Sequence, residues 1–288
     1  MASKTITPSA NPNTIYYLDG TASVPSSLSG KNVVKGTKAV GNVNFVAGYP
    51  CFVPADFDVD ATVAYTHTST FACDGRKGWQ TVTLPFGVQK VKAEGEIIDW
   101  NRDETDDGKD FWLKSFVDVQ NDKAHFMNVA EWVPNEPYLL GLPSSFIEKD
   151  VVMSANGTRV YKSGASAMVG SGYNFVGATG NRSLDKAFVL NDIGNAFELK
   201  TPAEIQAGQA YFVALSASNA NEVLYIDFGG LIGDVNGDGE ISVSDIMGIV
   251  NYVLGVEQNV FILENADVNG DGDISVADVL GLVNKYLE

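Results

Sequence analysis

Two stretches near the C-terminal end of the chain carry oxygen-bearing side chains at a regular spacing. They read DVNGDGEISVSDIMGIVNYVLG from Asp234 and DVNGDGDISVADVLGLVNKYLE from Asp267, and they agree at 14 of 22 positions. Calcium takes about six to eight oxygen ligands from a flexible loop, at loop positions 1, 3, 5, 7, 9 and 12, with glycine at position 6 for the sharp turn. Both stretches have this spacing, with Gly239 and Gly272 at the turn, so the sequence predicts two calcium-binding loops in tandem.

The predicted ligands are side-chain oxygens at positions 1, 3, 5 and 12, a backbone carbonyl at position 7, and a water held by serine at position 9. These positions are occupied in the first loop by Asp234, Asn236, Asp238, Glu240, Ser242 and Asp245, and in the second by Asp267, Asn269, Asp271, Asp273, Ser275 and Asp278. Each loop places three carboxylates at direct-ligand positions, so an empty loop repels itself and a bound ion relieves the repulsion. We expect two Ca2+ ions. The alternative is an acidic turn on a solvated surface, but two copies at a fixed offset argue against it.

The units differ from a complete EF-hand in two ways. Position 12 is Asp instead of Glu, and the residues before Asp234 read EVLYIDFGGLIG, a β-rich stretch that cannot form an entering helix. Each unit is therefore an EF-hand-like loop, with an inward Ile241 or Ile274 at position 8, followed by an exiting helix. Over residues 232–288 the chain resembles the dockerin type I family, whose module consists of two such units with two calcium ions. The resemblance implies that the helix faces bind a cohesin-type protein.

Apolar residues recur at helical spacing after each loop. We expect these stripes to pack the two helices together: Ile246, Ile249, Val250 and Val253, and then Val279, Leu282, Val283 and Tyr286. A mildly polar outer surface remains as the candidate partner-binding site: Ser244, Asn251, Tyr252, Ala277, Asn284 and Lys285. The resemblance implies a role in partner choice for loop positions 10 and 11, often small hydroxylated residues, and here only Ser244 carries a hydroxyl. The near-twofold repeat would permit two docking orientations.

Most of the negative charge belongs to these loops. The chain has a formal net charge of −17, and from Gly230 onward it contains 11 acidic residues and one lysine. No basic stripe occurs, which disfavours nucleic-acid binding. No apolar run approaches the ~18 residues that a transmembrane helix requires.

The first residues, MASKTITPSANPN, are polar and do not read as an export signal. We expect residues 1–12 to be disordered or added to the chain. Loops with three direct carboxylates suit abundant extracellular calcium, so we expect an extracellular or cell-surface protein whose export signal has been removed. Cys51 and Cys73 form a disulfide or remain as two buried thiols, and the sequence does not decide between these alternatives.

Residues 13–229 consist of short strand-like runs separated by Gly, Pro, Asn and Asp, which predicts a β-sandwich body. The expected strands are 15–18, 31–34, 42–46, 63–71, 79–84, 89–93, 97–100, 111–119 and 124–129, and further strands follow turns near 135–140 and 206–213. We predict a mainly β fold, in which the body is either one unit or two subdomains with a seam near 143–151, followed by a small α-helical calcium module over 230–288. The runs WQTVTLPFG and PYLLGLP resemble, more weakly, β-sandwich modules of surface and secreted proteins of the Bacteroidetes.

The body has few residues suited to catalysis. His67 and His125 are its only histidines and lie in strand-like runs, where a half-buried structural role is commoner than catalysis. Glu94 and Glu96 raise the question of a glycan-active enzyme, but their spacing places them on one strand face, as at a charged edge. Six aromatic residues form either a sugar-stacking face or part of the core: Tyr16, Tyr17, Trp79, Trp100, Trp112 and Trp132.

These observations favour a non-catalytic extracellular protein. Its calcium module would attach it to a cohesin-type partner or pack on its own β-body. The alternative is a carbohydrate-binding or adhesion sandwich that the module recruits, and a glycan-active enzyme is the third hypothesis.

Overall fold

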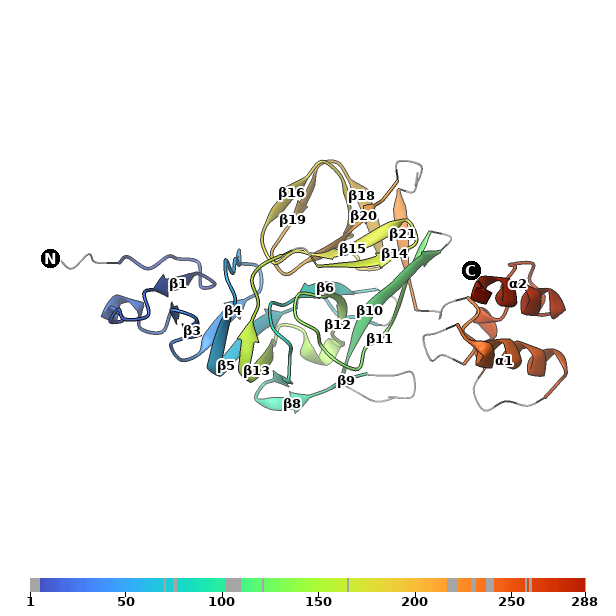
Figure 1. Cartoon of the computed structure of the whole chain (residues 1–288), viewed down its shortest axis with the longest axis horizontal. Helices are drawn as coiled ribbons and strands as arrows, with labels where there is room; N and C mark the ends of the chain where they lie inside the picture. The colour runs from blue at the N-terminus through green and yellow to red at the C-terminus, as the bar shows by residue number, and fades with distance from the viewer. Residues whose placement is uncertain are drawn as a thin grey trace.

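The fold is mainly β, with two helices at the C-terminal end (Figure 1). The computed structural model describes residues 6–69, 71–74, 77–101, 110–120, 122–164, 166–216, 222–228, 232–236, 241–256, 258 and 261–287. Large sheets form a sandwich-like body, and the helices lie at the end of the molecule opposite the N-terminal strands. This agrees with the predicted fold class.

The first sheet has eight strands within the described residues, in the order β1-β2-β3-β5-β13-β7-β8, with β4 also paired to β5. Its long central pair is antiparallel and runs from Asp150 opposite Thr68 to Val160 opposite Phe57. The strand bounds are β1 Ile15–Leu18, β2 Asn32–Lys35, β3 Lys38–Ala39, β4 Val43–Val46, β5 Phe57–Thr68, β7 Lys90–Ala93, β8 Glu96–Ile98 and β13 Asp150–Val160.

The second sheet has eleven strands in the described part of the chain, ordered β14-β15-β20-β17-β18-β21-β11-β10-β12-β6, with β9 beside β10. The bounds are β6 Gln80–Thr83, β9 Trp100–Asn101, β10 Phe111–Gln120, β11 Lys123–Asn128, β12 Pro137–Gly141, β14 Ala167–Gly170, β15 Tyr173–Gly177, β17 Ala187–Leu190, β18 Ala196–Lys200, β20 Ala210–Ala214 and β21 Val223–Asp227. A small separate sheet pairs β16, Arg182–Leu184, with β19, Ala203–Ile205. We call the strands from β14 onward the second lobe.

The helices are α1, Val243–Val253, and α2, Val276–Leu287. Short 3-10 turns cover Ser26–Leu28, Ser144–Phe146 and Leu263–Asn265. No described helix has the length and apolar character needed to cross a membrane.

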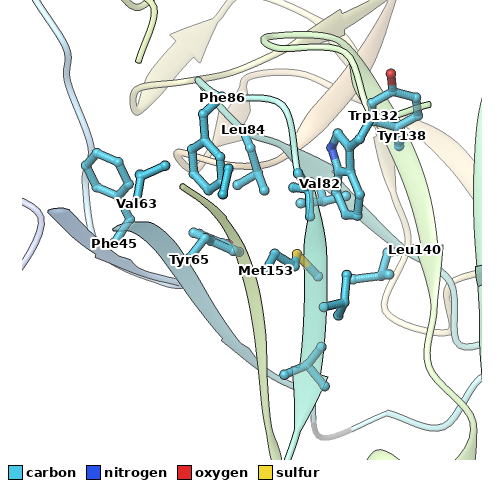
Figure 2. Packing of buried hydrophobic residues seen from close by; sticks show 14 of the residues in the cluster. Phe45, Val63, Tyr65, Val82, Leu84, Phe86, Trp132, Tyr138, Leu140 and Met153 are labelled. Atoms are coloured by element: carbon cyan, nitrogen blue, oxygen red, sulfur yellow. The ribbon is translucent and has the colours of Figure 1, made fainter. Parts of the chain in front are cut away.

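Strand β12 connects the two cores of the body, because both of its faces are buried. Tyr138 and Leu140 join the first core, which also contains Val63, Tyr65 and Met153 of the first sheet (Figure 2). Leu139, on the opposite face, joins the second core. The alternation of side chains along one strand therefore supplies both cores.

The second core is built from phenylalanines of several strands. Phe126, Phe175, Phe197 and Phe212 are almost fully buried. Their rings pack mostly edge to face, for instance Phe197 against Phe212 with centroids 4.8 Å apart. Such contacts contribute about 0.5–1.5 kcal/mol per pair beyond the area they bury.

Most of the expected strands are confirmed. The first matches β1 residue for residue, and the others overlap β2, β4 to β8, β10 and β11. Strands β12 and β20 follow the turns near 135–140 and 206–213, as expected. Residues 6–12, expected to be disordered or added, belong to the described structure, and the Asn11 side chain donates to the carbonyl of Pro50 at 2.8 Å.

The seam predicted near 143–151 does not divide the body. The chain passes through this segment and returns to the first sheet as β13, because the buried residues of β13 alternate in register with those of β5. The passage into the second lobe comes later, between β13 and β14.

Two open questions about the body are answered. Cys51 and Cys73 are not joined in a disulfide, and burial raises the pKa of the Cys51 thiol to about 12. Trp79, Trp100 and Trp132 are buried, and Trp112 packs against the second core. The tryptophans are therefore core residues and do not form the sugar-stacking face that was one of the expectations.

Candidate calcium and partner-binding module

The first loop leads directly into α1 through a capping box. The Ser242 hydroxyl accepts from the Ser244 N–H at 3.1 Å, and the Asp245 carboxylate accepts from the Ser242 N–H at 2.9 Å. The same carboxylate accepts from the N–H of Val235, at the start of the loop, at 3.0 Å. Asp245, at position 12, thus closes the loop and starts the helix.

The second loop repeats this arrangement. The Asp278 carboxylate accepts from the N–H groups of Val268 at 2.9 Å, Asn269 at 3.2 Å and Ser275 at 2.8 Å. Burial alone would raise the pKa of Asp278, but these hydrogen bonds together hold it below its ordinary value. The Ser275 hydroxyl accepts from the Ala277 N–H at 3.1 Å. Both serines therefore cap helices, a role that the S-x-x-D pattern signals and that the sequence analysis missed.

The backbone of the second loop winds around Asp267. Its carboxylate accepts from the N–H groups of Gly270, Asp271 and Gly272 at 2.8–3.2 Å. Asn269 donates from its side-chain amide to the Asp271 carboxylate at 2.8 Å. The residues at positions 1, 3 and 5 therefore lie in mutual contact on one turn of chain.

The loop residues fit a calcium ion by their chemistry. Asp234, Asp245 and Asp278 are almost fully buried, and buried carboxylates need positive or hydrogen-bonding partners. The second loop offers the hard oxygen donors that calcium prefers. Within the described residues, however, no three Asp, Glu, His or Cys side chains converge as they do around a bound metal. Asp238 and Glu240 of the first loop lie outside the described residues.

The module has its own small core. Ile249 of α1 and Leu282 of α2 are fully buried together with Val235 and Ala266. Ile241 and Ile274 pack against this core as expected, and so do Ile246 and Val279.

The predicted helical stripes are too long, however. Val253 and Tyr286 are 39% and 48% exposed, and neither Val250 nor Val283 belongs to the core cluster. Val235 and Val268, at position 2 of the two loops, contribute to the core as well: Val235 belongs to the buried cluster and Val268 packs against it.

Hydrogen bonds join the two units at their ends. The Asn265 side chain donates to the Asp234 carbonyl at 2.6 Å, and the Ile262 N–H donates to the Val235 carbonyl at 2.8 Å. Lys285, one of the predicted partner-binding residues, donates to the Ile232 carbonyl at 2.9 Å. It closes the module by joining its last helix to its first residues.

The outer surface of the module is more apolar than predicted. Of the predicted partner-binding residues, Ser244, Tyr252, Ala277 and Asn284 are exposed, and Asn251 is half-buried. Beside them lie two equivalent pairs of large apolar side chains, and these are also exposed: Val243 at 56% and Met247 at 50% on α1, and Val276 at 61% and Leu280 at 61% on α2. Residues four apart share a helix face, so each helix presents one apolar face to solvent.

Two capped loop–helix units, packed on a shared core and hydrogen-bonded to each other at their ends, form a small module of the loop–helix repeat class. Residues 232–288 match the family model of the dockerin type I domain. The match supports attachment to a cohesin-type protein, and dockerin type I domains typically bind calcium. The search of curated proteins found no match for the chain, and neither did the search of solved structures.

The carboxylates that raised the question of a glycan-active enzyme lie in an open hairpin. Glu94, in the β7–β8 turn, and Glu96, the first residue of β8, are both exposed, and Glu94 forms an ion pair with Lys149 at 2.7 Å. They face solvent, so this pair lacks the enclosed setting of two catalytic carboxylates.

Proposed function

We propose that the C-terminal module, residues 230–288, attaches the β-body to a cohesin-type protein domain. The observation that carries the proposal is the pair of equivalent apolar faces, Val243 with Met247 and Val276 with Leu280. These side chains are exposed with the β-body present, so the body does not cover them. This favours an external partner over packing of the module on its own body.

Calcium would hold this surface in place. The residues that would bind two ions are Asp234, Asn236, Asp238, Glu240, Ser242 and Asp245, and then Asp267, Asn269, Asp271, Asp273, Ser275 and Asp278. The ion supplies positive charge that offsets three carboxylates in each loop. Asp245 and Asp278 each bond both the loop start and the helix start, so loop and helix are oriented together.

The proposed setting is extracellular or at the cell surface, where calcium is abundant enough for loops with three carboxylates. We assign the β-body, residues 13–229, a non-catalytic role. The burial of its tryptophans and the exposure of Glu94 and Glu96 support this assignment.

Binding to a panel of purified cohesin domains, measured by biolayer interferometry, tests the attachment. We expect binding in calcium and loss of binding in EDTA. Since the two faces are equivalent, Met247→Asp alone should weaken binding about twofold, by removing one of two orientations. Met247→Asp with Leu280→Asp should weaken it by at least about tenfold.

Val169→Asp is the matched control, because Val169 is 73% exposed on β14 of the body. It should bind as the unaltered protein does. Absence of binding to every cohesin domain in calcium, with the module folded, would contradict the proposal.

A further inference from the structure

A cleft lies between the first sheet and the second lobe. Its volume is about 260 Å³, somewhat below the range of roughly 300–1,000 Å³ that is typical of small-molecule sites. One wall is formed by Tyr65 and His67 of β5, and the floor includes Gln80 of β6. The facing wall consists of two turns of the second lobe, residues 191–194 and 206–209.

Both turns are fixed to β6 and the residues before it. The N–H of Trp79 donates to the Gly194 carbonyl at 3.0 Å, and the N–H of Thr83 donates to the Gly208 carbonyl at 2.9 Å. Gly194 has a φ of +68°, and a Cβ there would lie 2.4 Å from the Trp79 carbonyl oxygen. The cleft therefore has rigid walls before any ligand enters it.

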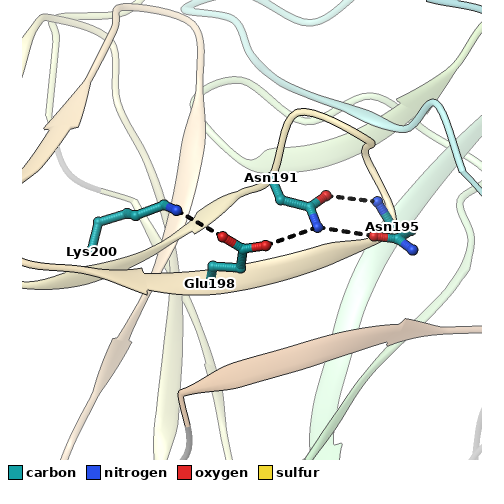
Figure 3. A network of polar contacts seen from close by, with 4 residues as sticks. All are labelled: Asn191, Asn195, Glu198 and Lys200. Carbon is teal, nitrogen blue, oxygen red and sulfur yellow. Dashed lines mark hydrogen bonds and ion pairs between the residues drawn. The ribbon is translucent and has the colours of Figure 1, made fainter.

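A polar network on the β17–β18 hairpin orders the first of these turns (Figure 3). The Asn191 amide donates to the side chains of Asn195 at 3.0 Å and Glu198 at 3.2 Å. Lys200 donates to Glu198 at 2.7 Å, so the network ends in an ion pair. Asp192 and Ile193 are thereby held at the cleft.

Hydrogen bonds determine which ring nitrogen of His67 carries the proton. The Ser69 hydroxyl donates to the Phe71 carbonyl at 2.8 Å, so it must accept from the Gln80 amide at 2.5 Å. The Gln80 carbonyl oxygen therefore accepts from His67 Nε2 at 2.9 Å. Burial lowers the pKa of His67, so the ring is neutral near pH 7 and its Nδ1 is an acceptor. Nδ1 has no hydrogen bond within the described part of the chain.

Tyr65 presents a second polar atom without a partner. Its side chain is only 9% exposed and stacks on His67, with ring centroids 6.4 Å apart. Its hydroxyl makes no hydrogen bond to the residues that the structure describes. Both residues line the cleft, so water or a ligand that enters it can pair with these two atoms.

The charge of the lining residues and the side chains at the rim of the cleft restrict the chemical class of the ligand. Among the described lining residues there is no Lys or Arg, and Asp192 is the one acid. An anion would therefore be repelled. Phe71 and Ile193, 54% and 58% exposed, give the rim an apolar face, and Gln206 adds an exposed amide. Donors and acceptors beside an apolar rim complement a ring that has hydroxyl groups and C–H faces.

We propose that this cleft binds a neutral sugar ring, with its hydroxyls on Tyr65 and His67 and its C–H face on Phe71 and Ile193. The ring is either a free monosaccharide or the end of an oligosaccharide. The site lies in the β-body, away from the calcium module, and it gives the body a binding role of its own.

Saturation-transfer NMR on the full chain tests the proposal. The probes are neutral monosaccharides, neutral oligosaccharides that end in the same sugars, and glucuronic acid. We expect transfer to at least one neutral sugar and none to the acid, and comparing the free and chain-terminal sugars identifies the source. Because the cleft is separate from the module, the signal should persist in EDTA, whereas cohesin binding should not.

Phe71→Ala and Ile193→Ala remove exposed side chains and should leave the fold intact, while weakening binding at least fivefold. His67→Gln should abolish binding. Ile97→Ala is the matched control, since Ile97 is 65% exposed on β8, and it should change nothing. Absence of transfer to every neutral sugar would overturn the proposal, as would binding that these cleft variants leave unchanged.

Discussion

At the scale of single residues, position 12 of each loop has the largest structural role. Asp278 is fully buried and accepts from the backbone of Val268 and Asn269 at one end of the loop and of Ser275 at the other. Asp245 does the same in the first loop. The short Asp side chain at this position ties the loop to its helix whether or not it also binds an ion.

Asp278→Ala is expected to destabilise the module by roughly 2–3 kcal/mol, because three N–H groups lose a charged acceptor and α2 loses part of its cap. Urea unfolding followed by circular dichroism at 222 nm measures the change, since both described α-helices lie in the module. Asp273→Ala is the control, because the exposed Asp273 is predicted to contribute only its carbonyl. Equal losses in the two variants would contradict the prediction.

The calcium ligands can be predicted from the sequence because a calcium loop is a local pattern, with all ligand positions within twelve residues. No local pattern indicates the hydrogen bond of Lys285, because its partner, the Ile232 carbonyl, lies 53 residues away. The cap role of Ser242 and Ser275 was readable, since the S-x-x-D pattern is as local as the loop itself.

At the scale of elements, the helices pack on the loops through glycine. A Cβ on Gly248 of α1 would lie 2.5 Å from Val235 Cγ2, and one on Gly281 of α2 would lie 3.3 Å from Val268 Cγ1. The two positions are equivalent in the repeat, but the first is the tighter. Each valine at loop position 2 packs against a helix turn that has no side chain.

Gly248→Ala is therefore expected to destabilise the module by about 1–3 kcal/mol through overpacking. At Gly281→Ala the gain in helix propensity, about 1 kcal/mol, should offset the milder contact and leave stability nearly unchanged. Thermal melts at 222 nm in calcium compare the two variants. A loss at Gly281→Ala that equals or exceeds the loss at Gly248→Ala would refute this account.

Strand positions were predictable from alternation and turn residues, as β1, β6 and β10 illustrate. Strand partners were not, because alternation does not specify a neighbour. The parallel pairing of β11 with β21 joins Lys123 to Tyr225, and no local pattern indicates it.

At the scale of the whole molecule, the module and the body have separate hydrophobic cores in the described part of the chain. The core around Ile249 and Leu282 contains no residue of the body. The four tryptophans all lie between Trp79 and Trp132. Tryptophan fluorescence therefore reports on the body, and helical circular dichroism reports on the module.

Calcium removal should therefore lower only one of two transitions. In EDTA we expect a lower Tm at 222 nm, because the loop carboxylates repel one another without the ion, and an unchanged Tm by tryptophan fluorescence. Asp234→Ala with Asp267→Ala should give the same result without chelator. A fluorescence transition that falls together with the helical one would show that the two parts unfold as one unit.

The place of the dockerin match, residues 232–288, could be predicted, because the motif and charge there differ from those of the body. The seam within the body could not, since Pro143 and the serines after it resemble a linker locally. Only the pairing of β13 with β5, which depends on the assembled sheet, identifies this segment as a connection within one body.

The pairing of β13 with β5 also affects how the chain folds during its synthesis. Asp150, which begins β13, follows its partner Thr68 by 82 residues. At about 5–20 residues per second, β5 waits roughly 4–16 s during synthesis for the strand that covers its second edge. During this interval the first sheet has an open edge of apolar strand, so the growing chain is most prone to mispairing before β13 is complete.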